Sequence, residues 1–233
     1  MYEKARLVVL VDDLPNTSRR DLIPAHGLSL YVDLKGDGGR FTILFDTGPS
    51  LELLVHNANT LNISPLSPCL VFLSVWLRHH VGGFVEALRR GMVKWEETIA
   101  PEFPGLRNRP PASGRLPPGT RIIGPYGRWF REQALAIEMD RGWLVITGCC
   151  VYGITKLITL LNTLQGKVYA LVGGLNLSAL DVLDGPALLK WAKRAGIEMI
   201  LPLHSTGPRA RKIILSRFGN GLKWSGVGLD VEL

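Results

Sequence analysis

A ten-residue segment, Ser74–Gly83 (SVWLRHHVGG), limits the possible folds of this chain more than any other part of its sequence. The apolar run Cys69–Leu73 before it predicts a buried strand, and Phe84–Arg90 after it has the spacing of a helix. Two adjacent histidines, His79 and His80, therefore lie in a loop between a strand and a helix. Loops held by such rigid elements often carry the side chains of a functional site, and imidazole is a common metal ligand.

Short apolar runs alternate with helix-period segments, and the predicted strands form two groups. The first group is Leu7–Val11, Leu28–Leu34, Phe41–Phe45 and Cys69–Leu73, and its second and third strands form a hairpin across a glycine-rich turn. The second group is Arg121–Ile123, Gln133–Met139, Trp143–Thr147, Val168–Val172 and Glu198–Leu201. The predicted helices are Ser50–Asn62, Phe84–Arg90, Gly153–Leu164, Pro186–Arg194 and Pro208–Arg217. This order predicts an α/β fold, an αββα four-layer sandwich in which two mixed β-sheets have helices outside.

A chain of 233 residues with 46% hydrophobic residues can bury one substantial core. We expect a single domain over residues 1–233. Residues 92–131 hold seven prolines and little periodicity, which predicts either an irregular surface connection or a partly mobile lid. No apolar run reaches membrane-spanning length, and the start leads directly into a strand, so we expect a cytoplasmic protein.

The net charge of +7 permits a phosphorylated ligand or nucleic acid as partner, although the charge is scattered. Arg128 and Arg131 flank Trp129 and Phe130, but one such cluster does not make a nucleic-acid-binding stripe, so nucleic acid is not favoured. The odd number of cysteines, three, predicts reduced thiols and no disulfide framework. The adjacent pair Cys149–Cys150 has no cationic neighbour in sequence that would activate it. Scarce glutamine and abundant arginine favour a heat-adapted source.

The segment from Ser74 resembles the metallo-β-lactamase superfamily motif Ser-His-x-His-x-Asp-His-x-Gly-Gly, with several letters changed. Val75 and Leu77 occupy the positions of the first two metal histidines, and His79 replaces the aspartate. Phe45–Gly48 matches the Asp-Thr-Gly usual upstream of the metal loop. The resemblance implies that Asp46 braces that loop.

Further motifs resemble the archaeal and bacterial group related to 7,8-dihydropterin-6-methyl-4-(β-D-ribofuranosyl)aminobenzene-5′-phosphate synthase, an enzyme type of methanopterin biosynthesis. They occur in the same order along nearly the whole chain: His26–Ser29, Leu54–Ala58, Glu132–Ile137, Leu144–Cys149, Val172–Leu177 and Leu203–Gly207. The family's histidine after Gly-Cys-Ser is Val151 here, and the histidine after Gly-Gly-Phe is Asn176.

These departures imply that the first metal site is lost. Its three ligand positions are Val75, Leu77 and Val151, and aliphatic side chains offer no lone pair to a cation. We expect the three side chains to meet and to fill the former cavity with hydrocarbon.

The resemblance places the second metal site at His79, His80 and His204. Three imidazoles can hold one zinc or other divalent metal, with water as the fourth ligand. The alternative is that no metal binds, that His80 and His204 are hydrogen-bonded semi-buried residues, and that His79 lies near the surface.

Other candidates for the same cleft are weaker. His26 and His56 either line it or act as structural hydrogen-bonding groups. Ser205 and Thr206, before the predicted helix at Pro208, either help to hold a phosphate or form an N-cap.

The sequence thus leaves several functions open. The first is a degenerate metallo-β-lactamase-fold protein that binds a small phosphorylated or pterin-like ligand without two-metal hydrolysis. The second is a single-metal hydrolase or transferase that uses His79, His80 and His204. The third, binding of nucleic acid through the basic surface, is the least favoured.

Overall fold

The computed structural model describes residues 1–64, 68, 70–102, 114–180 and 187–233. Eleven strands form one mixed sheet with two halves. In the first half, β1, β2 and β3 are antiparallel, β4 and β5 continue the sheet in parallel, and β11 pairs with β1. The bounds of these strands are β1 Tyr2–Val11, β2 Ser29–Gly36, β3 Gly39–Phe45, β4 Leu70–Phe72, β5 Thr98–Ile99 and β11 Asp230–Glu232.

The second half has the order β6-β7-β8-β9-β10, antiparallel across β6, β7 and β8 and parallel from there on. Its strands are β6 Thr120–Tyr126, β7 Glu132–Met139, β8 Gly142–Thr147, β9 Val168–Gly173 and β10 Met199–Pro202. Among the described residues, the ladder between the halves is a single parallel pair, Tyr2 with Met139. The two predicted sheets are therefore joined at one corner.

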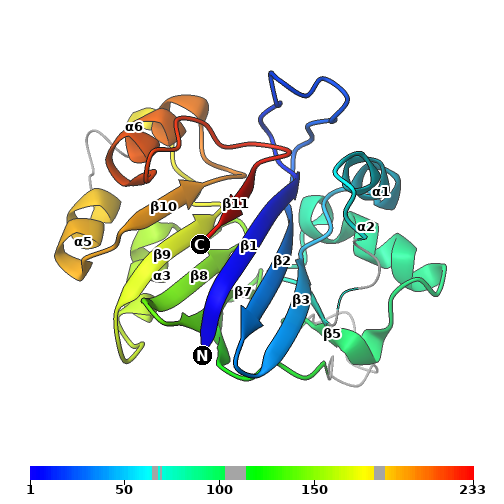
Figure 1. The fold of residues 1–233 in the computed structure, drawn as a ribbon, viewed down its shortest axis with the longest axis horizontal. Coiled ribbons are helices and arrows are strands. Elements are labelled where there is room, and N and C mark those ends of the chain that lie inside the picture. Colours follow the sequence, from blue (N-terminus) through cyan, green and yellow to red (C-terminus); the bar gives the residue numbers. More distant parts are fainter. Residues whose placement is uncertain (65–67, 69, 103–113, 181–186) are drawn as a thin grey trace.

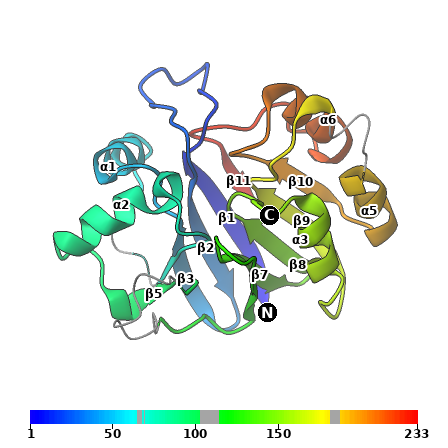
Figure 2. The same ribbon diagram turned by 180° about the vertical axis from the view of Figure 1, so that it is seen from behind.

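The main apolar core lies between the two halves of the sheet, which pack face to face (Figures 1 and 2). It combines side chains of β1 to β4, such as Leu7 and Phe45, with side chains of β7 to β10, such as Leu144 and Leu201. Alternation along β2 sends Leu30, Val32 and Leu34 into this core, as expected for a strand with one face buried. The core is thus the interior of a sandwich.

Helices cover the two outer faces (Figures 1 and 2). The first half carries α1 (Leu51–Thr60) and α2 (Arg78–Arg89), and the second half carries α3 (Ile154–Leu161), α5 (Ala187–Ala195) and α6 (Pro208–Phe218). Separate apolar clusters lie beneath these helices. The predicted αββα arrangement is confirmed. No helix in the described part of the chain is long and apolar enough to cross a membrane.

The start of α2 differs from the prediction. The helix begins at Arg78, not at Phe84, so His79 and His80 lie in its first turn. The pair Gly82–Gly83 lies inside the helix. A Cβ on Gly82 would approach the carbonyl oxygen of Pro49 to 2.1 Å, and one on Gly83 would approach that of Thr47 to 2.6 Å. These glycines allow close packing of α2, rather than a turn.

The proline-rich connection of residues 92–131 is more regular than predicted. Besides β6, it contains a 3₁₀ turn at Trp95–Glu97 and the short strand β5, which extends the first half of the sheet. The part of this connection that we interpreted as a lid lies largely at residues 103–113, outside the described residues. The predicted helix start at Pro186 also lies outside the described residues.

Candidate metal centre

Several polar residues follow the ends of strands at one edge of the sandwich, the edge that is at the top in Figure 1. They lie after β1, β3, β4, β8 and β10, and the carboxyl ends of all these strands point to this edge. Open α/β sheets commonly place their ligand sites at such an edge. The residues concerned are Asp12, Asp13, Asp46, Ser74, His79, His80, Cys149 and His204.

Four of these side chains form a compact cluster of metal-ligand type. One ligand atom from each of His79, His80, Cys149 and His204 lies within 4.8 Å of the others. The Nε2 atoms of His79 and His80 are buried and have no hydrogen-bond partner in the described part of the chain. Buried polar atoms are nearly always paired, so two adjacent unpaired imidazole nitrogens fit a missing ligand such as a metal ion.

Asp46 fixes the orientation of His80. Its carboxylate lies 2.7 Å from His80 Nδ1 and accepts hydrogen bonds from the backbone N–H and the hydroxyl of Ser74, at 2.7 and 2.6 Å. All three residues are fully buried. In the neutral form of His80 the carboxylate thus holds the proton on Nδ1 and leaves the lone pair on Nε2, as in many metal-bound histidines. Asp46 therefore connects Ser74 to His80.

Asp13 fixes the orientation of His204 in the same way. Its Oδ1 lies 2.8 Å from His204 Nδ1, and its Oδ2 accepts from the backbone N–H of Ser205 at 3.1 Å. Burial raises the pKa of Asp13, but the hydrogen bonds from His204 and Ser205 outweigh burial and hold that pKa below its usual range. The sequence prediction missed Asp13; the available signal was a carboxylate two residues past the end of a buried strand, Leu7–Val11.

His26 lies on the solvent side of the cluster. Its side chain is 72% exposed, and its Nδ1 lies 3.4 Å from Asp13 Oδ1. Its ring centroid is 4.6 Å from that of His79 and 4.8 Å from that of His204. His26 is therefore part of the same site, as one of the two alternatives proposed.

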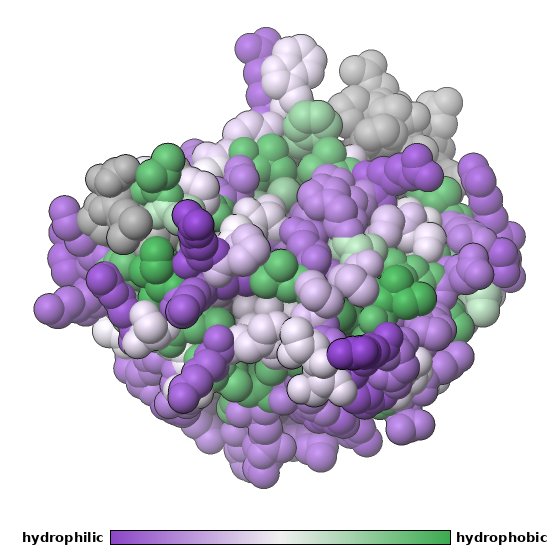
Figure 3. Space-filling view, turned by 90° about the horizontal axis from the view of Figure 1, so that it is seen from above, coloured by the Kyte–Doolittle hydropathy of each residue, from purple (hydrophilic) through white to green (hydrophobic). Residues whose placement is uncertain are grey.

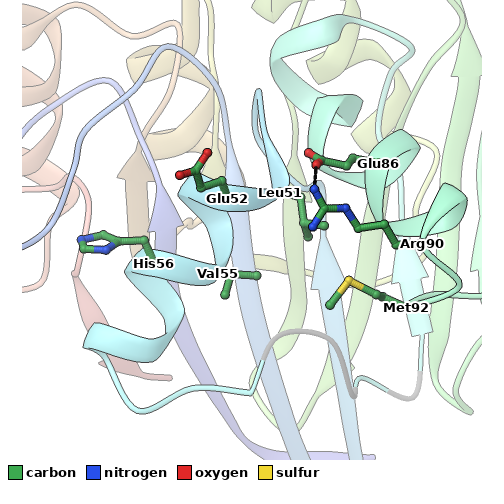
Figure 4. A pocket seen from close by; sticks show the side chains of 7 residues that line it. All are labelled: Leu51, Glu52, Val55, His56, Glu86, Arg90 and Met92. Carbon is green, nitrogen blue, oxygen red and sulfur yellow. Dashed lines mark hydrogen bonds and ion pairs between the residues drawn. The ribbon is translucent and has the colours of Figure 1, made fainter.

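His56 does not lie with the cluster. It is on α1, where its Nε2 lies 2.9 Å from the backbone oxygen of Asp21. It lines a separate groove between α1 and α2, together with residues that include Leu51 and Arg90 (Figure 4). Of the two alternatives for His56, the role of a structural hydrogen-bonding group agrees with this position.

Cys149 was not predicted as a ligand. Its Sγ lies 3.9 Å from His204 Nε2. Burial raises the pKa of its thiol, but the nearby imidazoles of His204, His79 and His80 outweigh burial and lower the pKa to about 4. The groups that face this thiol are imidazoles from other parts of the chain, which its neighbours in sequence do not reveal.

A buried carboxylate shapes the turn that carries Cys149. Glu132 on β7 accepts backbone N–H groups of Cys149, Cys150 and Val151 at 3.1, 2.6 and 2.8 Å. Cys150 has φ 59°, so the chain turns sharply directly after Cys149. The side chain of Cys150 is buried in the apolar cluster beneath α3, and burial raises the pKa of its thiol. The two neighbouring cysteines thus lie in different surroundings.

We expect Glu132→Gln to lower the free energy of unfolding by about 1–3 kcal/mol, because its amide N–H would face a backbone N–H donor in a buried site. Urea unfolding of metal-free protein measures this change. Glu138→Gln, an exposed position on the same strand, is the matched control and should change stability by less than about 0.5 kcal/mol. Equal effects of the two substitutions would contradict the assigned role of Glu132.

Two of the three positions that the resemblance assigns to a first metal site, Val75 and Val151, lie beside Glu132. Val75 is fully buried and forms an isolated β-bridge with Glu132, whose carboxylate holds the N–H of Val151. Leu77 is the N-cap residue of α2. Aliphatic side chains at all three positions offer no ligand atom to a cation. Since none of the three belongs to the four apolar clusters of the described residues, their mutual packing stays a prediction.

Ser205, Thr206 and Asn176 connect the loops around the cluster. The Ser205 hydroxyl donates to the carbonyl oxygen of Cys149 at 2.9 Å and accepts from the N–H of Asn176 at 3.0 Å. The Thr206 hydroxyl accepts from the N–H of Leu175 at 3.2 Å. The N-cap of α6 is Gly207, without a side-chain cap, so the N-cap interpretation of Ser205 and Thr206 was wrong. Asn176 adopts φ 48°, a left-handed conformation that asparagine tolerates well.

Comparisons with known proteins agree with this fold. No family model matches the chain. A 7,8-dihydropterin-6-methyl-4-(β-D-ribofuranosyl)-aminobenzene-5′-phosphate synthase of Methanocaldococcus jannaschii is 24% identical over 249 residues, covering 83% of this chain and 85% of that protein. This agrees with the resemblance predicted from the motifs.

Solved structures give the fold. A metal-dependent hydrolase of the beta-lactamase superfamily has a TM-score of 0.68 at 23% identity, covering 98% of this chain and 99% of its own. The short form of human tRNase Z has a TM-score of 0.54 at 10% identity, with 97% and 98% covered. A diphosphatase of the PhnP family has a TM-score of 0.52 at 11% identity, with 100% and 98% covered. The architecture is that of the metallo-β-lactamase superfamily.

Proposed function

We propose that this chain, which has the metallo-β-lactamase fold, binds one transition metal ion through His79, His80 and His204. We propose further that it has lost two-metal hydrolysis and binds a small phosphorylated or pterin-like ligand. The pair of buried, unpartnered Nε2 atoms on His79 and His80 is the observation that carries this proposal. An unpaired buried polar atom costs about 1–3 kcal/mol, so two side by side favour a bound ion.

The donor set suits zinc or a similar ion. Three neutral imidazoles are common ligands of Zn²⁺, and carboxylates on the far ring nitrogens, here Asp46 and Asp13, increase their basicity. An ion bound here would supply Lewis-acid chemistry only while one of its coordination positions stays open to a ligand. The chain's own residues would hold and orient that ion, and His26 would stand between it and solvent.

Loss of two-metal hydrolysis follows from the residues at the first-site positions. A bridging hydroxide needs two cations to lower its pKa and to clamp the reacting group. Val75, Leu77 and Val151 cannot ligate the first of those cations. The proposed function is therefore binding, with one ion at most.

A small anionic ligand is supported by two observations. The relative at 24% identity is named for a phosphorylated dihydropterin product, and this chain has a net charge of +7. Figure 3 shows the molecule from above, from the side of the edge that bears the cluster. This face is largely hydrophilic, and its apolar side chains lie in separate small areas. Such a face suits a polar small molecule better than a large apolar partner.

Two measurements on the purified full-length chain test this function. Equilibrium dialysis against zinc should give about one ion per chain, and the zinc-loaded protein should not hydrolyse bis(p-nitrophenyl) phosphate above background. Titration with a pterin and with inorganic pyrophosphate, followed by thermal shift, should show stabilisation by at least one of them. No bound zinc, or rapid hydrolysis, would refute the proposal.

The second candidate is a single-metal hydrolase or transferase that uses the same three histidines. The observation in its favour is His26, an exposed imidazole within reach of the cluster that could exchange protons with a substrate. This enzyme needs an open position on the ion. Its test is turnover by zinc-loaded protein that His26→Ala abolishes while zinc stays bound.

Zinc affinity should increase with pH up to about pH 9. Burial lowers the pKa of His80, but Asp46 outweighs burial and raises it to about 9. Below that pH a metal ion must displace the proton from His80 before it can bind, so each pH unit should weaken binding by up to about tenfold. Competition titrations with a chelator between pH 6 and pH 9 measure this slope. An affinity independent of pH would contradict the role of His80 as a ligand.

A further inference from the structure

We infer that Cys149 is the fourth ligand of the bound ion, so that a Cys–His₃ set encloses the metal and leaves no position for water. This inference rests on the proposed function, because it concerns the ion held by His79, His80 and His204. It goes further, since it names a ligand outside the predicted set and decides whether the site is closed.

The distances fit a set of four ligands. In a tetrahedral zinc site, with Zn–N near 2.0–2.1 Å and Zn–S near 2.3 Å, adjacent ligand atoms lie roughly 3.3–3.6 Å apart. The Sγ of Cys149 lies 3.9 Å from His204 Nε2, and all four ligand atoms lie within 4.8 Å of one another. The ligand atoms thus lie farther apart than in a metal-bound site by up to about 1.5 Å, a difference within the range of side-chain rotation.

The backbone holds Cys149 in position from both sides. Its N–H donates to Glu132, and its carbonyl oxygen accepts from the hydroxyl of Ser205, the neighbour of His204. The left-handed conformation of Cys150 then turns the chain away. These contacts connect the cysteine turn directly to the histidine loop, so the thiol is a built part of the cluster.

Charge supports the same conclusion. His80 and His204 are fully buried, and the carboxylates of Asp46 and Asp13 lie behind their rings, one imidazole away from the ion. A thiolate from Cys149 would place a negative charge in direct contact with the ion in this buried site. A tetrahedral set of sulfur and nitrogen ligands is typical of Zn²⁺, and Co²⁺ can replace zinc as a visible probe. A closed set also argues against the single-metal enzyme, which needs an open position.

Cobalt titration of the full-length protein tests the inference. We expect one Co²⁺ per chain, with a near-ultraviolet thiolate-to-cobalt charge-transfer band and the visible bands of tetrahedral cobalt. Cys150→Ser is the matched control and should keep both. Cys149→Ser should lose the charge-transfer band and bind the ion at least about tenfold more weakly.

The two failures are distinguishable. Absence of cobalt from the wild-type chain would refute the proposed function itself. Stoichiometric cobalt without the charge-transfer band, or a band lost in Cys150→Ser and kept in Cys149→Ser, would refute only the role of Cys149. X-ray absorption of the zinc-loaded wild-type chain needs no variant to fold, and should show one sulfur and three nitrogens around the ion; nitrogen and oxygen alone would overturn the inference.

Discussion

Replacing His204 with alanine is expected to reduce bound zinc from about one ion per chain to nearly none. The substitution removes an Nε2 donor and also frees Asp13, whose carboxylate would then lie beside the pocket without its imidazole partner. Loss of one ligand of three or four typically leaves a site too weak to survive dialysis against a chelator. Elemental analysis after such dialysis, relative to protein concentration, measures the change.

His56→Ala is the control for His204→Ala. His56 is another of the five histidines of the chain, but it lies on α1 and contacts the backbone of Asp21. It should leave zinc content unchanged. Thermal unfolding of both variants separates loss of the site from loss of the fold. If His204→Ala retains a full equivalent of zinc while folded, His204 is not a ligand.

Replacing Arg211 with methionine is expected to cost about 3–5 kcal/mol of unfolding free energy, the largest stability effect we predict. Arg211 on α6 is 2% exposed and Asp12 after β1 is fully buried. The guanidinium donates to both oxygens of Asp12, at 2.6 and 3.2 Å, and to the carbonyl oxygens of Thr206 and Ser225. The variant would leave a buried carboxylate without its counter-charge, beside the loop that carries His204.

Arg6→Met is the matched control for Arg211→Met. Arg6 also forms a two-bond pair with an aspartate, Asp230, but the two side chains are 41% and 44% exposed. Exposed pairs contribute about 0–1 kcal/mol. Urea denaturation of the metal-free proteins gives both free energies. Similar losses of unfolding free energy in the two variants would show that burial does not determine how much the Arg211–Asp12 pair contributes to stability.

Much of the fold was predictable because its signals are local. The alternation of β2 and β3, with glycines between them, specifies a hairpin. The strands β7 to β10 coincide with apolar runs in the sequence. The start of α2 was not predictable in this way. Glycines normally weaken a helix, and only the close approach of Pro49 and Thr47 explains why two of them lie inside this one.

The candidate site was likewise predictable only in part. His79, His80 and His204 could be placed by motif resemblance, and the structure brings them together. Cys149 and Asp13 could not, because their partners are distant in sequence: Cys149 lies 55 residues from His204, and Asp13 lies 191 residues from it. Their chemistry arises only where the ends of strands meet in space.

The central claim is tested most directly by a crystal structure of the zinc-loaded chain with data collected at the zinc edge. The account predicts one anomalous peak per chain, surrounded by His79, His80, Cys149 and His204. Two peaks, or a single peak beside Val75, Leu77 and Val151, would contradict it.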